Sequence, residues 1–154
     1  LDSNGHINCS PKGGDSFRII DPKTVVYQDL TGSGIETVAH VRENTRIVIM
    51  FCAFEGTPKI IRLYGKAEVI DEKHGEYRSM MVKFNPNIGA RAFIRIKLTR
   101  IADSCGYGVP LLSYVGNRDV LDKFALAKGE AELRDYRKQK NVKSIDGSGS
   151  YPAF

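Results

Sequence analysis

The segment 91–101 (RAFIRIKLTRI) constrains the fold of this chain more than any other stretch of its sequence. Apart from Phe93, its apolar and polar side chains alternate. One side would carry Ile94, Ile96, Leu98 and Arg100, and the other Arg95, Lys97 and Thr99. A period of two residues is typical of an antiparallel strand with one face in the core and the other in water. We therefore predict a half-exposed antiparallel strand here.

Other segments of the chain have strand character as well. We predict them at His6–Ser10, Phe17–Ile20, Thr24–Leu30, Arg46–Phe54 and Lys59–Ile70. The longest apolar run, 47–54, has the length of a buried strand, which makes Cys52 a core residue. Gly65 interrupts the alternation of its strand and indicates a bulge or a point of close backbone approach.

Three helices are predicted between these strands. Ser33 and Glu36 have the S-x-x-E spacing of a capping box, with Ser33 as N-cap of a helix that ends near Glu43. A short helix is expected at 76–84. A long amphipathic helix is expected from about 119 to 142, interrupted at Gly129, with a stripe formed by Val120, Leu121, Phe124, Ala125, Leu133 and Tyr136. Residues 103–110 are expected to form a glycine-rich loop, and residues 144–154 a loose tail.

Five or six strands joined mostly by short turns, with helices and no βαβ repeat, predict a mainly β fold. We expect an antiparallel β-barrel with flanking helices, formed as a single domain by residues 1–154. The turn at Asp2–Gly5 is followed by a strand and preceded by none. Since a hairpin turn needs two strands, we expect a further strand ahead of residue 1.

Charge and composition narrow the function classes. The chain has a formal net charge of +5, concentrated in Lys138–Lys143. We interpret these cations as a solvated helix end that suits the macrodipole, and we expect no nucleic-acid partner, because no binding motif accompanies them. No apolar stretch reaches the ~18 residues of a membrane span. Cys9, Cys52 and Cys105 are far apart and have no metal-ligand spacing, so we expect a cytoplasmic protein without a metal site.

Two loops have the character of a phosphate site. The first, Asn8–Gly13, offers a hydroxyl and a cation directly after a strand. The second, Asp29–Gly34, leads into a helix, and its small residues would let backbone N–H groups reach a ligand. Thr31 and Ser33 add hydroxyl donors, and the helix N-terminus adds partial positive charge. The alternative is that Ser33 only caps the helix and the glycines only make the turn.

The same loops carry a resemblance to the pyridoxamine 5′-phosphate oxidase-like family, which binds flavin mononucleotide (FMN). The matching segments, in chain order, are His6–Gly13, Val26–Gly34, Glu36–His40, Ile49–Gly56, Arg62–Gly65, Asp103–Pro110 and Ser144–Gly147. The resemblance implies a Greek-key split β-barrel that forms a homodimer with FMN at the subunit interface. It also implies one more strand before Asn4.

The resemblance assigns candidate cofactor-binding residues: Asn8, Ser10, Lys12, Tyr27, Asp29, Thr31, Ser33 and Tyr107. Lys12 is the best candidate for neutralising the phosphate, and Arg42 a weaker one. The strand at 46–54 would lie against the isoalloxazine or build the dimer core. Two interpretations of Tyr107 are possible. Its ring could stack on a flavin or substrate, or its glycine-rich loop could be only a tight turn that closes one end of the barrel.

The chain also departs from the family. The oxidases proper carry a basic pair after the serine of the phosphate turn, where this chain has Gly34 and Ile35. The C-terminal segment that holds pyridoxal phosphate is not recognisable either. We therefore do not expect pyridoxamine phosphate to be the substrate. The leading hypothesis is an FMN-dependent oxidoreductase acting on a small-molecule redox substrate. The alternatives are a non-catalytic flavin binder and a relative that uses haem or deazaflavin, with His6 or His40 as axial haem ligand.

Overall fold

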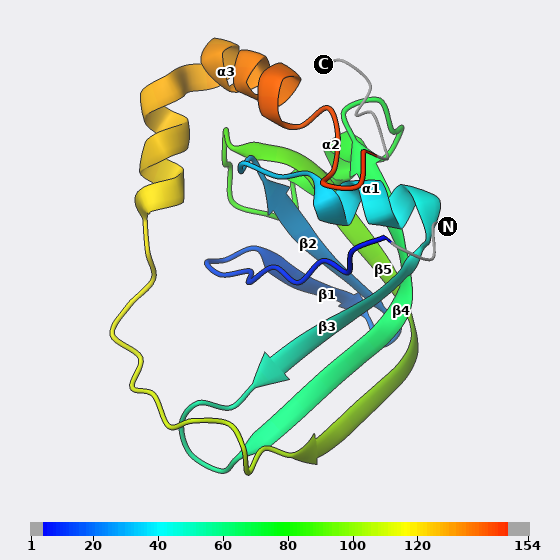
Figure 1. Cartoon of the computed structure of the whole chain (residues 1–154), viewed down its shortest axis with the longest axis vertical. Coiled ribbons are helices and arrows are strands. Elements are labelled where there is room, and N and C mark those ends of the chain that lie inside the picture. The colour runs from blue at the N-terminus through cyan, green and yellow to red at the C-terminus, as the bar shows by residue number, and fades with distance from the viewer. Residues whose placement is uncertain (1–4, 148–154) are drawn as a thin grey trace.

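The structure, a computed structural model, describes residues 5–147 and is built around one antiparallel sheet (Figure 1). Its strands are β1 (Phe17–Asp21), β2 (Thr24–Leu30), β3 (Arg46–Cys52), β4 (Lys59–Asp71) and β5 (Ala90–Cys105). Its helices are α1 (Glu36–Glu43), α2 (Tyr77–Met81) and α3 (Val120–Lys140). The predicted mainly β fold with flanking helices is confirmed.

The strand order is β1-β2-β5-β4-β3, and every neighbouring pair is antiparallel. Because β2 lies beside β5 instead of β3, the last four strands have a Greek-key order. The sheet is strongly bent but not closed (Figure 1), and β1 and β3 are its outer strands. Phe17 of β1 and Phe51 of β3 nevertheless touch edge to face, with ring centroids 5.4 Å apart.

Gly65 lies where the two long strands β4 and β5 bend together. The register between them shifts between Tyr64 and Gly65. A Cβ at Gly65 would lie 2.5 Å from the carbonyl oxygen of Lys97, which is closer than real Cβ contacts allow. The bulge and the close approach predicted at this glycine are both confirmed.

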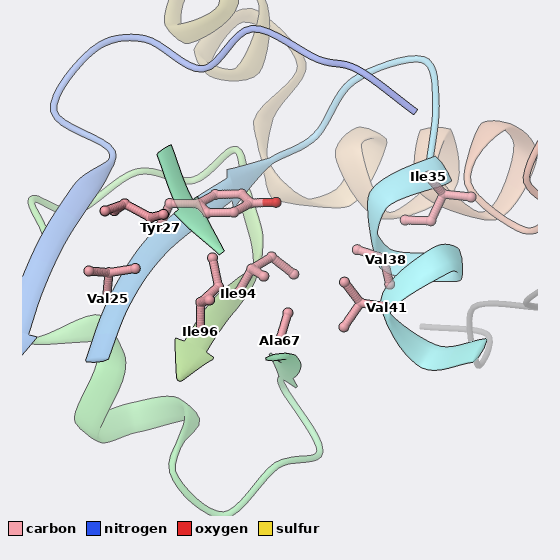
Figure 2. Close-up of a cluster of buried hydrophobic side chains, with 9 residues drawn as sticks. Val25, Tyr27, Ile35, Val38, Val41, Ala67, Ile94 and Ile96 are labelled. Carbon is pink, nitrogen blue, oxygen red and sulfur yellow. The ribbon is translucent and has the colours of Figure 1, made fainter. Parts of the chain in front are cut away.

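The two faces of the sheet carry separate clusters of buried apolar side chains. On one face, Val25, Tyr27, Ile94 and Ile96 pack against Ile35, Val38 and Val41 at the start of and within α1 (Figure 2). On the other face, Val26, Ile70 and Phe93 pack against Met80 and Phe84. The off-phase Phe93 is explained by this second cluster, since the start of β5 is buried on both faces.

The predicted capping box at Ser33 is wrong. Helix α1 begins at Glu36, Ile35 occupies the N-cap position, and no side chain in the described chain caps the helix. Ile35 is almost completely buried in the first cluster. The carbonyls of Gly32 and Gly34 accept hydrogen bonds from residues far along the chain. These contacts hold the turn around Ser33 outside the helix.

Two strand predictions also need correction. Residues 6–10 form no strand, and the contacts that hold them are made with side chains of Thr37 and Asp146 instead of a neighbouring strand. Strand β3 is present but not buried, because it is an outer strand with exposed residues on both faces. Cys52 is therefore half-buried and not a core residue.

Smaller corrections concern the ends of elements. Strand β5 continues to Cys105 because Lys59 pairs with that residue, so the predicted loop starts later than Asp103. Helix α2 ends at Met81, followed by turns at residues 82 and 83. The predicted turn at residues 2–5 and tail at 144–154 lie largely outside the described residues. No helix within 5–147 is long and apolar enough to cross a membrane.

Helix α3 consists of two halves that meet at Gly129, as predicted. This residue has φ 68° and ψ 171°, a conformation that glycine adopts readily. Of the predicted apolar stripe, Ala125 and Leu133 are buried, whereas Val120 and Leu121 are exposed. Its C-terminal end is not simply a solvated cationic tip, because Arg137 and the following Asn141 are buried.

Candidate functional site

The two loops that were predicted to form a phosphate site do lie against each other. Lys12 Nζ is 3.3 Å from Asp29 Oδ1 and 5.4 Å from the centroid of the Tyr27 ring. The side chain of Lys12 remains more than a third exposed. Its ammonium group therefore combines an ion pair and a cation–π contact with access to solvent.

Asp29 is completely buried and shared between two cations. Its second carboxylate oxygen accepts a 2.7 Å hydrogen bond from Arg91 Nε. The same guanidinium donates to the Gly34 carbonyl at 2.9 Å and to Asn141 Oδ1 at 2.7 Å. Arg91 is 5% exposed, so this is a buried ion pair whose guanidinium also donates to two further oxygens. It anchors the turn that leads into α1.

The C-terminal end of α3 also holds this turn. Arg137 Nε donates to Thr31 Oγ1 at 2.8 Å, and that hydroxyl donates to the Gly89 carbonyl at 2.8 Å. Asn141 Nδ2 donates to the Gly32 carbonyl at 3.0 Å. The turn is thus fixed by side chains from β5 and from α3.

The predicted site residues separate into two groups. Tyr27, Asp29 and Thr31 are buried, with 4%, 0% and 1% of their surface exposed, and they build the support of the turn. Burial raises the pKa of Tyr27, with the nearby Asp29 carboxylate acting in the same direction. The exposed group is Ser10, Lys12 and Ser33, with the half-buried Asn8 donating to Thr37 Oγ1 at 2.7 Å.

Two further candidates lie elsewhere. Tyr107 is 84% exposed and follows the far end of β5, well away from the loop at 8–13 (Figure 1). Arg42, the weaker phosphate candidate, makes a 2.7 Å ion pair with Asp71 on β4. Neither residue meets Lys12 within one chain.

The sequence patterns did not lead us to predict a role for Arg91, Arg137 or Asn141. A signal existed for two of them. Leu133, Arg137 and Asn141 are spaced by four residues and share one face of a helix, so the buried stripe of α3 continues through polar residues. Arg91 gave no such signal, since its partner Asp29 is 62 residues away.

The N-terminus of α1 faces the exposed group. No side chain in the described residues caps this helix, so its first N–H groups keep their partial positive charge. The Glu36 carboxylate folds back over Gly34, and a Cβ at Gly34 would clash with it. An anion at this helix end would thus be attracted by the backbone and by Lys12, and repelled by Glu36.

A second polar cluster joins the two ends of the described chain. His6 Nδ1 is 2.6 Å from Asp146 Oδ1, and His40 Nε2 is 3.8 Å from Asp146 Oδ2. The Asp146 hydrogen bond raises the pKa of His6, and the His6 hydrogen bonds lower the pKa of Asp146. Within residues 5–147, no three His, Cys, Asp or Glu side chains gather so as to hold a metal ion.

Fold and site together define a small antiparallel β-protein with an exposed lysine beside an uncapped helix N-terminus. Residues 1–105 match the family model described as pyridoxamine 5′-phosphate oxidase. The chain therefore belongs to the pyridoxamine 5′-phosphate oxidase family.

Known proteins similar to it include a fungal relative and a solved bacterial structure. The pyridoxamine 5′-phosphate oxidase family protein ustO of Aspergillus flavus is 40% identical over 92% of this chain. The aligned region spans 64% of that relative's length. A crystal structure of a HupZ variant from Group A Streptococcus has a TM-score of 0.51 and 26% identity, covering 68% of this chain and 84% of that one.

Proposed function

We propose that this protein binds FMN as a homodimer and acts as an oxidoreductase on a small-molecule redox substrate. The observation that carries the proposal is the position of Lys12, an exposed ammonium group held beside the turn that enters α1. Bound FMN supplies the redox chemistry, and the protein supplies binding, orientation and electrostatics.

The residues present fit the phosphate end of the cofactor. Lys12 would neutralise the phosphate by a charge-assisted contact, and the uncapped amides of α1 would donate to its oxygens. The hydroxyls of Ser10 and Ser33 lie on exposed segments and would add donors. Lys12 can turn to the phosphate without leaving Asp29 unpaired, because Arg91 holds that carboxylate.

The outer strands support a homodimer in which two bent sheets complete split barrels. Val48 and Tyr64 are cross-strand partners on β3 and β4, and with Met50 they form an exposed apolar patch. Such patches mark association surfaces. Because Tyr107 lies far from Lys12 of its own chain, we propose that it reaches the flavin bound by the partner chain.

The test is FMN binding by the wild type and by Lys12→Gln, followed by quenching of flavin fluorescence. We expect Lys12→Gln to weaken FMN binding about tenfold or more, as for the loss of a charged hydrogen bond. Riboflavin, which has no phosphate, should bind both proteins equally. Lys23→Gln, an exposed lysine in the β1–β2 turn, is the matched control. A wild type that takes up no FMN, or equal FMN affinities of both proteins, would contradict the proposal.

A non-catalytic flavin binder would have the same site, so binding alone does not identify an enzyme. The distinguishing measurement is the oxidation of the reduced, protein-bound FMN by small quinones and by dioxygen. An oxidoreductase should oxidise its bound cofactor faster than free reduced FMN is oxidised with at least one acceptor. Rates that never exceed those of free FMN would favour the storage role.

One observation favours haem as a second candidate. His6 Nδ1 is bound to Asp146, whereas its Nε2 makes no hydrogen bond within residues 5–147. A histidine whose other ring nitrogen is held by a carboxylate is typical of metal-ligating imidazoles. Haem reconstitution with a Soret band that is lost in His6→Ala would support this candidate. A spectrum unchanged by that substitution would exclude His6 as the ligand.

A further inference from the structure

A cavity lies on the face of β2 opposite to Lys12 and Tyr27. Its volume is about 400 Å³, within the range of small-molecule sites. The walls come from the loop 13–16, the loop 85–88 and the first turns of α3, and the floor from Gln28 and Leu30 of β2. Because Val26, Gln28 and Leu30 alternate with Tyr27, the cavity is separated from the proposed phosphate site by the sheet itself.

The floor of the cavity carries an amide that has no protein partner. Gln28 is 7% exposed, and within the described residues its side chain makes no hydrogen bond, although its backbone N–H donates to Ser16 at 2.8 Å. No fully buried side-chain nitrogen or oxygen of the described residues lacks a partner, so the polar atoms of this amide are reached from the cavity. Since Gln28 lines the cavity, a ligand held there is the group that can satisfy it.

The walls are fixed before any ligand arrives. Asn85 Nδ2 donates to Asp15 Oδ2 at 2.8 Å, which ties the loop 85–88 to the loop 13–16. Asn87 Nδ2 donates to Asp122 Oδ1 at 2.8 Å, which ties the same loop to α3. A cavity whose walls are bonded to each other does not need to be ordered by its ligand, which favours binding.

The charges around the cavity select the ligand. No lysine or arginine lines it, whereas Asp15 and Asp122 do. The Asp15 carboxylate is neutralised by two hydrogen bonds from Arg18, at 2.6 and 2.7 Å. Asp122, at the rim, accepts a hydrogen bond from Asn87 but forms no ion pair with a cation of residues 5–147. Leu30, Ile88 and Leu126 provide an apolar wall between rim and floor.

We propose that this cavity binds a small organic cation with an ammonium group at one end, an apolar body and a hydroxyl or amide at the other. The ammonium group pairs with Asp122, the body packs on Leu30 and Ile88, and the polar end bonds to the amide of Gln28. Phosphorylated and carboxylated compounds are excluded by the acidic rim. The site is independent of FMN, because it lies on the other face of the sheet.

Tyramine has these three features and is the probe for the test. Binding is followed by NMR in the full chain, through the backbone amide resonances of residues 13–16, which line the cavity, in every variant and through the side-chain amide resonances of Gln28 in the wild type. Two matched compounds isolate each contact. Phenethylamine lacks the hydroxyl, and 3-(4-hydroxyphenyl)propanoate carries a carboxylate in place of the ammonium group. We expect saturable shifts with tyramine, weaker binding of phenethylamine and no binding of the propanoate.

Two variants separate the contacts further. Gln28→Met should lower the affinity for tyramine to that for phenethylamine, and it should leave the affinity for phenethylamine unchanged. Asp122→Asn should weaken tyramine binding about threefold, as for the loss of a partly exposed ion pair. It should also reduce the preference for tyramine over the propanoate. Asp119→Asn, on the same helix end but paired with Lys123, should change nothing.

The outcomes decide the proposal even if one variant does not fold. Absence of saturable shifts of Gln28 with tyramine, or equal binding of the propanoate, would overturn it. Equal affinities of wild type and Gln28→Met for tyramine would also overturn it. If Gln28→Met does not fold, the comparison of tyramine with phenethylamine on the wild type and the Asp122→Asn result still decide.

Discussion

The guanidinium of Arg91 donates from Nε to the buried carboxylate of Asp29 at 2.7 Å, joining two strands whose residues are 62 positions apart. This ion pair lies directly beneath the exposed Lys12 and beside the turn that enters α1. It therefore connects the stability of the sheet to the geometry of the proposed phosphate site.

The first prediction concerns this pair. Arg91→Met should lower the free energy of unfolding by about 3 kcal/mol, because it leaves a buried carboxylate with Lys12 as its remaining cation. Urea denaturation followed by circular dichroism measures the effect. The control is Arg134→Met on the exposed face of α3, for which the change should stay within about 0.5 kcal/mol. Equal stabilities of the two variants would show that the pair contributes little.

The second prediction concerns the contact between α3 and the turn. Asn141→Ala removes the donor to the Gly32 carbonyl and the acceptor of Arg91. We expect a loss of about 2 kcal/mol, because buried polar partners remain unsatisfied. Amide hydrogen exchange should accelerate at Thr31, whose N–H donates to Gly89. The exposed neighbour Val142→Ala is the control, and unchanged exchange at Thr31 in Asn141→Ala would contradict the coupling.

Much of this arrangement could be predicted from local patterns and some of it could not. Alternation located β4 and β5, strand-forming residue types located β1 and β2, and the glycines at 65 and 129 marked the bulge and the kink. The proximity of Lys12 to the turn also followed from the sequence. These features depend on residues that are close along the chain, or on conformations that favour glycine.

The features that were missed depend on long-range contacts. The capping box at Ser33 satisfies a local rule, yet Asn141, 109 residues beyond Gly32, holds the turn in another conformation. The apolar run of β3 indicated burial, but a run of this composition also occurs on an outer strand with an exposed apolar face. Composition alone does not say whether the covering surface belongs to the same chain.

The third prediction uses the carboxylate at the start of α1. Glu36 folds over Gly34, where it would repel a bound phosphate. Glu36→Gln should therefore strengthen FMN binding about threefold, the magnitude of a partly exposed charge interaction, and leave riboflavin binding unchanged. Fluorescence titration measures both affinities. Glu43→Gln at the other end of α1 is the control, and an unchanged FMN affinity of Glu36→Gln would place the phosphate elsewhere.

The fourth prediction concerns pH. The pKa of His6 is raised in the folded state. Its contribution to the stability of the fold is therefore fully present below its unfolded-state pKa of 6.5, and is lost as the pH rises through its folded-state pKa. The pKa of Asp146 is lowered from 3.8 in the folded state. Its contribution to stability is therefore present above pH 3.8 and is lost as the pH falls through the folded-state pKa. The contact between these residues should thus be strongest between about pH 4 and 6.5.

The measurement for this contact is an NMR titration of the His6 imidazole in the wild type and in Asp146→Asn. The substitution should lower the pKa of His6 towards its ordinary value, because it removes the charged acceptor. Asp135→Asn, an exposed aspartate on α3, should leave the titration unchanged. An identical His6 titration in the wild type and Asp146→Asn would show that the two residues are not paired in solution.

The last prediction tests the apolar patch formed by Val48, Met50 and Tyr64. Its residues are exposed on two paired strands, and a charge placed at their centre would have to be desolvated when a second chain covers the patch. Val48→Glu should therefore weaken the dimer at least tenfold, measured by sedimentation equilibrium, and lower FMN affinity in parallel if the cofactor lies at the interface. Val82→Glu, at a still more exposed valine that follows α2, should change neither. A Val48→Glu protein with wild-type association would place the interface on another face.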